Sequence, residues 1–431
     1  MRNLLRCCRG SASFATVVAL VPLIGAVALG AEGGSWYVTR QHAQNAADAA
    51  AYSGALRLAC SLAAGGGVAC ADANSVDYRG KQFAAQNAFC NAGDTSYPGS
   101  RCLTSLPSGT SQAVQTAVNG NFVQATVSQQ QPAYLAAVLG LSTVSIGATA
   151  TAEVVVLAKP CVLSLQDPIS FQGSPTVSAP KCGLASNNTT ANSISFTGNS
   201  GIDIGNVGSI AGEGGCAQTG GTQCSRAITY ASPVPNPLSG LDSAMSSLST
   251  ANFSGQCTSA PKAYGAGNTC YNKAFTFGNQ TYNLNGVYFF SGALKVQGNA
   301  TITGTATLIL LPGASLKING NPTIQINALT SVSTTQVPAA LASVVNLLAG
   351  LLIYDPETSS SGVKITGSST SYFNGITYVP NSDVTYQGST QSYSCVEVIA
   401  KGVTLAGNSN FDNSGCPASV KAQSQYVRLV Q

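Results

Sequence analysis

The sequence predicts a mainly β protein. An N-terminal transmembrane helix continues into a small α+β module, and a parallel β-solenoid (β-helix-like) domain with a disulfide-stapled insertion follows. Three observations predict this fold: an apolar run near the N-terminus, an alanine-rich stretch directly after it, and a strand–glycine pattern that recurs in the second half. Only 8% of the 431 residues are charged and 44% are hydrophobic, whereas a disordered chain combines low hydrophobicity with high net charge. The composition therefore indicates a folded protein.

The first element is an apolar helix over residues 10–31, which contain no charged side chain. At a rise of 1.5 Å per residue, a helix of this length covers about 33 Å, enough to cross a bilayer core of about 30 Å. Arginines precede the run at positions 2, 6 and 9, and Glu32 follows it. By the positive-inside rule, residues 1–9 form a cytoplasmic basic tail, and the rest of the chain lies in the periplasm or outside.

A cleaved signal peptide is the competing interpretation of this run. The tripeptide Ala26-Val27-Ala28 fits the A-x-A pattern of a cleavage site. However, the apolar run continues past it to Ala31, and a further helical pattern follows instead of a flexible start. We therefore favour an uncut, single-pass anchor in the inner (cytoplasmic) membrane, with lipid contacts through residues 10–31.

Residues 32–158 are expected to form an exported α+β module. Its first part, Ser35–Ala59, is rich in alanine, the best helix former, so one helix is expected to leave the membrane and enter this module. The residues that share one face of this helix are Ala43, Ala46, Ala47, Ala50 and Leu58. The other expected elements are helices over residues 76–90 and 133–141 and strands over residues 121–128 and 143–157.

Three motifs of this region carry a resemblance to a known family. They are the pair Arg9-Gly10 that opens the apolar helix, the run QNAADAAA over residues 44–51, and the run YLAAVLGLSTVSIGATATAEV over residues 134–154. Residues 9–157 resemble the N-terminal module of TadG-like proteins of Flp (tight-adherence) pilus assembly. Flp pilins and related pseudopilins carry a glutamate five residues after a cleaved glycine, and Ala15 stands there in this chain. The resemblance therefore implies an unprocessed, membrane-anchored assembly component.

The alanine-rich helix holds the candidate helix-packing or assembly residues, which are Gln44, Asn45, Ala46, Ala47 and Asp48. Asp48 is the most distinctive of them, because a carboxylate on such a helix is either a solvated side chain or a specific assembly contact. The single histidine, His42, is expected to be exposed or to cap a helix end, since no catalytic or metal-binding partner stands near it in the sequence.

Twelve of the 14 cysteines lie beyond residue 59 in sequence-local couples. The disulfide candidates are Cys60 and Cys70, Cys90 and Cys102, Cys161 and Cys182, Cys216 and Cys224, Cys257 and Cys270, and Cys395 and Cys416. None forms a C-x-x-C pair, which argues against a metal site. An even number of spaced cysteines indicates disulfides in an oxidising compartment, although the spacing leaves the connectivity open and buried free thiols are the alternative. Cys7 and Cys8 precede the apolar helix and are expected to stay reduced.

The second half, residues 159–431, repeats a short pattern of apolar–x–apolar–x–Gly followed by Asn or Ser. The copies begin at Ile169, Ile194, Leu294, Leu316, Val363, Val384 and Val403. Stacked repeats bury a core only together, and a Gly-Asn or Gly-Ser corner supplies the positive φ that such a turn needs. The pattern therefore predicts a parallel β-solenoid with asparagine ladders, and an antiparallel sandwich with Gly-Asn hairpins is the alternative.

Two segments interrupt the repeats. Residues 206–285 contain four cysteines and the proline run Pro233-Val234-Pro235-Asn236-Pro237, so we expect a disulfide-stapled surface excursion there. The stretch over residues 338–350 is apolar but too short to span a bilayer, and we expect it to cover a hydrophobic flank or end of the solenoid.

The candidate catalytic groups of the second half are few. Asp355 and Glu357 are close in sequence but separated by a proline, and Asp203 and Asp383 stand at polar positions beside repeat strands that could meet across coils. We therefore expect no enzyme, no cofactor and no metal, and the charge distribution gives no stripe for nucleic acid.

The expected function is a membrane-anchored extracytoplasmic structural component of Flp pilus assembly, secretion or surface attachment. Its expected partners are other pilus-assembly or envelope proteins. A surface adhesin or glycan-binding β-helix protein is the main alternative, and a tethered polysaccharide lyase or hydrolase is a further one.

Overall fold

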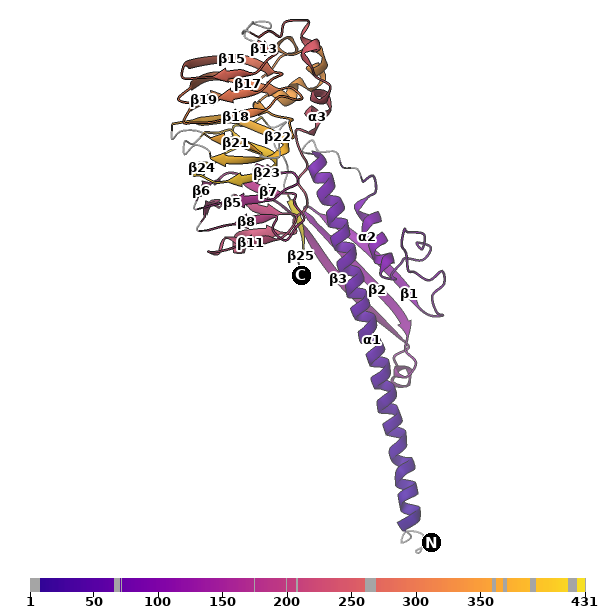
Figure 1. The fold of residues 1–431 in the computed structure, drawn as a ribbon. Helices are drawn as coiled ribbons and strands as arrows, with labels where there is room; N and C mark the ends of the chain where they lie inside the picture. Colours follow the sequence, from indigo (N-terminus) through magenta and orange to yellow (C-terminus); the bar gives the residue numbers. More distant parts are fainter. Residues whose placement is uncertain are drawn as a thin grey trace. The chain divides into compact units, whose positions relative to one another are not determined.

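The computed structural model describes two compact units. It describes residues 8–65, 70, 72–173, 175–198, 200–206, 208–259, 269–358, 362–366, 370–387, 393–417 and 425–430. Unit 1 contains residues 1–64, 69–155 and 427–431, and unit 2 contains residues 65–68 and 156–426. Figure 1 shows the helices and strands of both units.

Unit 1 is organised around one long helix, α1, which runs over Cys8–Gly65 without a break. Its N-terminal part is long and apolar enough to cross a membrane, and none of its most apolar window is buried. The helix then continues into the alanine-rich stretch, whose alanines are buried. The expectation that one helix joins the apolar run to the outer module is therefore confirmed, and the apolar part fits a single-pass anchor.

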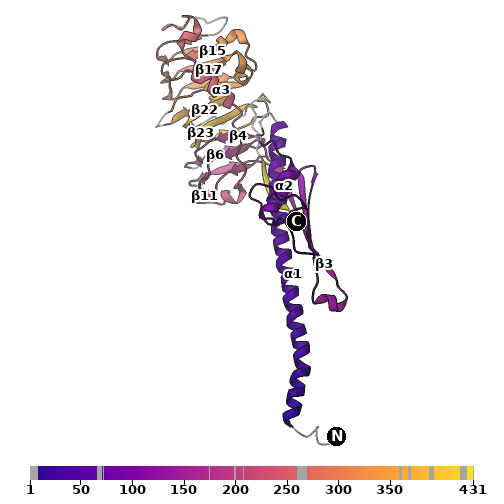
Figure 2. The same ribbon diagram turned by 90° about the vertical axis from the view of Figure 1, so that its right-hand side faces the viewer.

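The rest of unit 1 is a small α+β layer on this helix (Figures 1 and 2). Its elements are α2 (Val76–Gln86), β1 (Ser111–Asn119), β2 (Phe122–Pro132), the 3-10 helix η2 (Ala136–Leu139), β3 (Thr143–Val156) and β25 (Gln425–Val430). The sheet has the order β1-β2-β3-β25, and β2 pairs antiparallel with both β1 and β3. The side chains of β2 alternate, so that Val123, Ala125 and Val127 are buried against the alanines of α1.

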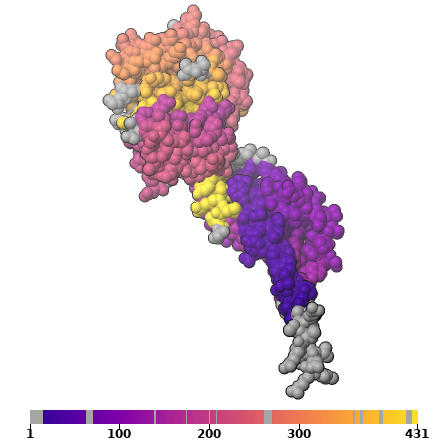
Figure 3. All heavy atoms as spheres, turned by 60° about the horizontal axis from the view of Figure 1, so that its bottom comes forward, coloured from indigo at the N-terminus to yellow at the C-terminus, as the bar shows by residue number. Residues whose placement is uncertain are grey.

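The C-terminal strand is the main departure from the expected domain boundaries. We expected residues 159–431 to form one domain, but β25 joins the sheet of unit 1 beside β3. Val427 belongs to the core of unit 1, and Arg428 pairs with Glu153 of β3 at 2.7 Å. Figure 3 shows this C-terminal segment in yellow against the indigo and purple atoms of unit 1. Unit 2 is therefore inserted between the third and fourth strands of the first sheet.

Unit 2 is mainly β, and its long sheet consists of parallel strands. The strands along its path, in chain order, are β4 (Pro160–Ser164), β7 (Gly183–Ser186), β10 (Ile210–Gly212), β12 (Ala227–Thr229), β13 (Thr269–Tyr271), β15 (Thr281–Phe290), β17 (Thr301–Leu310), β19 (Thr323–Asn327), β22 (Tyr372–Gln387) and β23 (Val396–Leu405). Their order in space is β12-β10-β7-β4-β23-β22-β19-β17-β15-β13. The pairings between named strands of unit 2 in the described residues are all parallel, which contradicts the alternative of antiparallel hairpins.

The copies of the repeated pattern that begin at Val384 and Val403 lie within β22 and β23, and the other five copies form short strands outside this path. They are β5 (Ile169–Phe171), β8 (Ile194–Phe196), β16 (Leu294–Val296), β18 (Leu316–Ile318) and β21 (Val363–Thr366), together with β6 (Thr176–Ser178), β9 (Gly201–Asp203), β11 (Cys216–Gln218), β14 (Phe275–Phe277), β20 (Leu351–Tyr354) and β24 (Ser409–Asn410). Equivalent residues of successive repeats pair in register, as Ile169 does with Ile194 and Leu294 with Leu316. The repeats therefore stack directly on one another.

The chain enters this stack in its middle. From β4 it builds outward through β7 and β10 to the edge strand β12, and then it crosses to the opposite edge at β13. From there it builds back through β15, β17, β19 and β22 to β23, which pairs with β4. Residues 206–229, which we expected inside a surface excursion, instead contain paired strands of the body. The excursion is thus narrower than expected and serves as the crossover between the two ends.

Two apolar cores hold unit 2 together. One lies inside the coils and contains Phe171, Phe196 and Phe290. The other contains Phe289, Ile309 and Ile399 of the long sheet and is completed by the crossover helix α3 (Ser239–Ser246) and the 3-10 helices η4 (Thr250–Phe253) and η6 (Ala339–Leu348). The structure thus places the stretch over residues 338–350 on an apolar flank, as the sequence predicts.

Disulfides reinforce both units. They join Cys60 to Cys70, Cys90 to Cys102, Cys161 to Cys182, Cys216 to Cys224, Cys257 to Cys270, and Cys395 to Cys416. Each bond links two members of one sequence-local couple, so the cross-links staple neighbouring segments and leave the order of the strands to the core.

Candidate functional site

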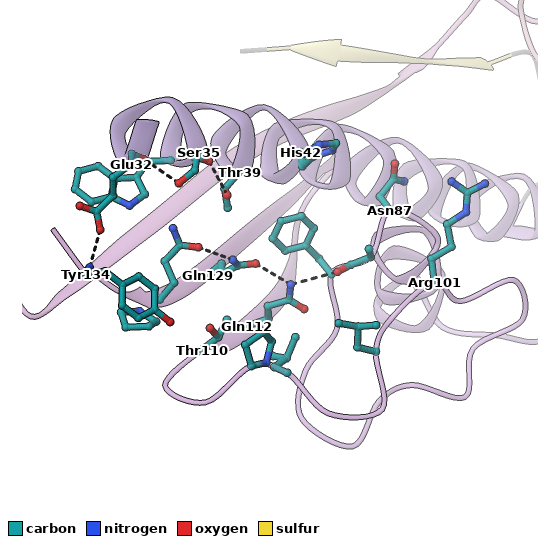
Figure 4. A pocket seen from close by; sticks show the side chains of 18 residues that line it. Glu32, Ser35, Thr39, His42, Asn87, Arg101, Thr110, Gln112, Gln129 and Tyr134 are labelled. Carbon is teal, nitrogen blue, oxygen red and sulfur yellow. Dashed lines mark hydrogen bonds between the residues drawn. The ribbon is translucent and has the colours of Figure 1, made fainter. Parts of the chain in front are cut away.

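A cavity of unit 1 with a volume of about 580 Å³ forms a groove beside α1 (Figure 4). One wall is α1 just after the apolar run, and the others are strands β1 and β2 and the loop that joins α2 to β1. Its lining includes Glu32, Trp36, His42, Arg101 and Tyr134.

Glu32 closes one end of this groove through its carboxylate. The backbone N–H groups of Tyr134, Leu135 and Ala136 donate to its two oxygens at 2.6, 3.1 and 2.8 Å. These successive donors open the 3-10 helix η2, where backbone N–H groups lack partners within the helix and favour an anion. The first charged residue after the apolar run therefore fixes the tip of the β2–β3 hairpin beside α1.

A chain of glutamine side chains forms another part of the lining. The Nε2 of Gln129 donates to Oε1 of Gln131 at 2.9 Å, and the Nε2 of Gln112 donates to Oε1 of Gln129 at 2.9 Å and to the carbonyl of Ala88 at 3.2 Å. Because each amide is both donor and acceptor, the chain ties β2 to β1 and to the loop after α2 without any net charge. Sequence reasoning missed this network, and the only signal for it is the run Gln129-Gln130-Gln131 at the end of a strand.

The charged residues of the groove do not form a reactive constellation. His42 and Arg101 line it, and both are exposed. The described residues contain no group of three or more His, Cys, Asp or Glu side chains that could hold a metal ion. The groove thus combines a fixed carboxylate, neutral amides and aromatic rings.

The helix-packing candidates point in different directions. Ala46 and Ala47 are fully buried against the sheet of unit 1, whereas Asn45 is exposed. Nε2 of Gln44 donates to Oδ1 of Asp48 at 2.8 Å, one helical turn away. The structure thus uses the alanines for packing within unit 1 and gives Asp48 a partner on its own helix.

The four acidic candidates of unit 2 are not gathered into one site. Asp203 accepts a hydrogen bond from the backbone N–H of Gly205 at 3.0 Å and so shapes its own turn on β9. Asp383 lies on β22, where burial and the neighbouring carboxylate of Asp167 raise its pKa, and Lys401 pairs with Asp167 at 2.7 Å. These two aspartates therefore have separate surroundings.

The carboxylates of Asp355 and Glu357 also accept hydrogen bonds from backbone N–H groups. The N–H of Glu357 donates to Oδ1 of Asp355 at 3.1 Å, and Oε2 of Glu357 accepts from the N–H of Gly313 at 3.1 Å. Asp355 is only 1% exposed, and this burial raises its pKa from the usual 3.8 to about 6. The pair holds a turn next to β20.

Comparison with known proteins bears on the N-terminal segment. No curated protein and no solved structure matches the chain. Residues 10–57 match the family model described as "Putative Flp pilus-assembly TadE/G-like". The match covers the apolar run, the groove residues Glu32 and His42, and the alanine-rich motif of α1. The N-terminal segment of this chain is thus similar to TadE/G-like segments of the Flp pilus-assembly type, as its two opening motifs predict.

Proposed function

We propose that this protein is a single-pass, membrane-anchored structural component of Flp pilus assembly. The observation that carries the proposal is the family match over residues 10–57, because the matched segment is one continuous helix that joins an apolar span to a folded outer module. The partners of such a component are other pilus-assembly or envelope proteins.

Two independent features support an orientation with the N-terminus in the cytoplasm. Arginines at positions 2, 6 and 9 precede the apolar run, and basic residues favour the cytoplasmic side. The six disulfides all lie after the run, and disulfides persist in oxidising compartments such as the periplasm. Both features support a position of units 1 and 2 on the outer side of the inner membrane.

We further propose that unit 2 is a parallel β-solenoid. In-register pairing of equivalent repeat residues supports this, as does the stacking of Asn374 on Asn327, whose side chains are joined at 2.8 Å. A stack of coils presents long, regular faces, and such faces suit protein or glycan partners better than catalysis. We therefore propose a structural role without enzymatic activity.

The test is deletion of the gene followed by complementation in the native host, with pili counted by electron microscopy. We expect deletion to abolish pili and the full chain to restore them. A matched variant, in which residues 1–31 are replaced by a cleavable secretion signal, keeps both units but loses the anchor, and we expect it not to restore pili. Unchanged pili on deletion would contradict the role in assembly, and rescue by the unanchored variant would contradict the anchor.

The cysteines provide a test of orientation. Cys7 and Cys8 are the only cysteines outside the six couples. A maleimide that cannot cross the inner membrane should leave the chain unlabelled in intact spheroplasts and label it after permeabilisation. Labelling before permeabilisation would contradict a cytoplasmic N-terminus.

A second candidate function, binding of acidic polysaccharide, is favoured by a row of lysines on unit 2. Lys295 and Lys317 stand in register on neighbouring parallel strands, and Lys364 lies on β21, which contacts β18. Like charges directly opposite each other on strands about 4.8 Å apart are destabilising. In the part of the chain that the structure describes, no carboxylate lies within ion-pair distance of these three. A polyanion would relieve this repulsion.

This second candidate is tested with the detergent-solubilised full chain on immobilised alginate and on neutral dextran. Salt-sensitive retention on alginate alone is expected, and the triple variant Lys295→Gln, Lys317→Gln, Lys364→Gln should lose it. A control triple variant, Arg40→Gln, Arg101→Gln, Arg226→Gln, removes the same charge from exposed positions elsewhere. Equal loss in the two triple variants would reduce the effect to net charge and reject the row as a site.

A further inference from the structure

The tip of the β2–β3 hairpin, residues 133–142, exposes apolar side chains to an unusual degree. Tyr134 is 74% exposed, Leu141 51% and Leu135 42%. Such side chains seldom gather on a surface that faces only water, and contiguous exposed apolar groups mark interaction sites. The exposed apolar side chains therefore make the hairpin tip a candidate interaction site.

The Glu32 contact fixes the position of the hairpin tip along α1. The Glu32 carboxylate holds the N–H groups of Tyr134, Leu135 and Ala136, so the tip lies beside the residue at which the apolar part of α1 ends. Both views of the ribbon show the loop between β2 and β3 lying along α1, with the helix continuing beyond it toward the N-terminus (Figures 1 and 2). An element at this level of α1 is at the boundary of any bilayer that the helix spans.

The composition around the tip matches a lipid interface. No charged residue occurs between Arg101 and Glu153 in the sequence, so the strands that lead to the tip bring no charge to it. On α1, Trp36 and Tyr37 follow Glu32 within about one turn. Tyrosine and tryptophan concentrate where a membrane meets water, because their rings are apolar and their polar atoms can still reach water.

We propose that the hairpin tip inserts into the interfacial layer of the bilayer leaflet from which α1 emerges, so that unit 1 contacts the membrane at two points. This inference rests on the proposed membrane anchor. The occupant of the apolar surface is lipid, because the Glu32 contact continues the lipid-facing surface of the helix directly into the tip. The second contact fixes the rotation of α1 about its axis and holds the groove at the membrane surface.

The test measures depth with a single tryptophan in the full chain. Trp36 is the only tryptophan, so Trp36→Phe gives a silent background for three probes. Tyr134→Trp probes the tip, and Leu23→Trp probes the apolar part of α1. Phe122→Trp is the matched control, because Phe122 is an exposed aromatic residue at the opposite end of β2, about 34 Å from Pro132 at the strand rise. Each variant is reconstituted into phosphatidylcholine–phosphatidylglycerol vesicles that carry bromine near the headgroup or near the chain end.

We expect headgroup-proximal bromine to quench the probe at position 134 at least twofold more than the probe at position 122. The probe at position 23 should be quenched most by bromine near the chain end. If position 23 is quenched while position 134 behaves like position 122, the anchor stands and the hairpin contact is rejected. If position 23 is not quenched, the anchor itself is rejected, and this inference fails with it.

A charge placed at the tip provides a second readout. Leu141→Asp in the Tyr134→Trp background should abolish the quenching at position 134, because an ionised side chain without a hydrogen-bond partner is costly to insert among lipid chains, whereas Leu141→Asn should reduce it only in part. Quenching that persists in full with the aspartate would contradict insertion of the tip. Quenching at position 23 in the same Leu141→Asp chain, measured with its own probe, shows that the anchor is intact.

Discussion

Glycines at the corners of unit 2 stack on the glycines of the neighbouring coil. Gly173 and Gly198 both have φ near +80°, at 80° and 77°, as the repeat pattern predicts for its corners. A Cβ on Gly198 would lie 2.5 Å from the carbonyl oxygen of Gly173, whereas a Cβ on Gly173 would meet nothing within 4 Å. Gly320 likewise lies on Gly298, where its Cβ would be 2.8 Å from the carbonyl oxygen, but a Cβ on Gly298 would itself clash with Oδ1 of Asn279, and Gly407 lacks the positive φ. In the first pair, Gly173 is thus needed for its φ alone, and Gly198 for its φ and its lack of a side chain.

This difference leads to a prediction for a matched pair of variants. Gly173→Ala should destabilise its coil by about 1–2 kcal/mol, the cost of a left-handed conformation. Gly198→Ala should cost about 1–3 kcal/mol more, because the new methyl group clashes with the backbone of the next coil. Hydrogen exchange of the β5 and β8 amides measures both effects. Equal effects of the two substitutions would show that φ alone sets the requirement.

Asp355 is a second residue whose surroundings predict a measurable effect. Burial raises its pKa from 3.8 to about 6, and the backbone N–H groups of Glu357 and Leu316 offset only part of this shift. The folded state thus holds the proton more tightly than the unfolded state, so stability falls as the pH rises from about 4 to about 6 and is constant above that range. An ionised Asp355 is a cost that unit 2 carries at neutral pH.

Asp355→Asn should therefore raise the stability of unit 2 at pH 8 by about 1–3 kcal/mol and leave it nearly unchanged near pH 4. The amide oxygen can still accept from the N–H of Glu357. Chemical denaturation at the two pH values, with the wild-type chain measured in parallel, gives the difference directly. A gain of the same size at both pH values would contradict titration of this carboxylate as the cause.

At the scale of elements, α1 is one helix with two kinds of surface. Its apolar part is exposed over residues 15–31, with most side chains open, and its later part buries Ala43, Ala46, Ala47 and Ala50 against the sheet. Small side chains allow this close approach, and a Cβ on Gly54 would already lie 2.9 Å from a methyl group of Val123. The helix–sheet distance in unit 1 is thus set by the absence of large side chains.

Ala47→Leu should therefore destabilise unit 1 by about 1–3 kcal/mol through overpacking. Asn45→Leu adds a larger apolar side chain at a nearby exposed position of the same helix and should change stability by less than about 0.5 kcal/mol. The rate of limited proteolysis in the β1–β2 turn, which is in unit 1, reports the difference. Similar rates for the two leucine variants would argue against tight packing on this face.

The elements show what the sequence could and could not predict. Periodicity found the long helix, strands β2 and β3 and the repeated strands, because each depends on residues that are near one another in the chain. It missed β1, and the helix expected over residues 133–141 is only the 3-10 helix Ala136–Leu139. The groove was not predicted, since it depends on Glu32 meeting residues 134–136 and on Gln112 meeting Gln129 across strands. Both contacts join residues that are far apart in the sequence, so no local sequence pattern predicts them. The repeats beyond Gly198 were obscured because β10 and β12 lack the Gly-Asn corner that marks the other copies.

At the scale of the whole molecule, the order of the chain and the order in space differ. The long sheet of unit 2 begins at β4 and ends at β23, two neighbours in the middle of its order, although the intervening chain visits both ends. This arrangement brings the entry and exit of unit 2 together, as insertion between β3 and β25 requires. No local sequence pattern predicts that the strands at the entry and exit of unit 2 pair with each other. The short pattern of residues 425–430, with its single charge at Arg428, could belong to either unit, and only pairing with β3 decides between them.

The closing strand gives the last prediction. β25 covers the edge of β3, contributes Val427 to the core of unit 1, and adds the Arg428–Glu153 ion pair. Deletion of residues 425–431 should expose the β3 edge, so its amides should exchange at least tenfold faster, while those of β15 and β17 in unit 2 keep their protection.

Arg428→Gln is the matched control, because it removes only a partly exposed ion pair, and such pairs contribute about 0–1 kcal/mol. Its effect on β3 exchange should be at most a few-fold. If the deletion changed β3 no more than this single substitution does, the C-terminal strand would not be part of the folded core of unit 1. If it instead loosened β15 and β17, the strand would belong to the stability of unit 2, and the insertion of one unit into the other would have to be abandoned.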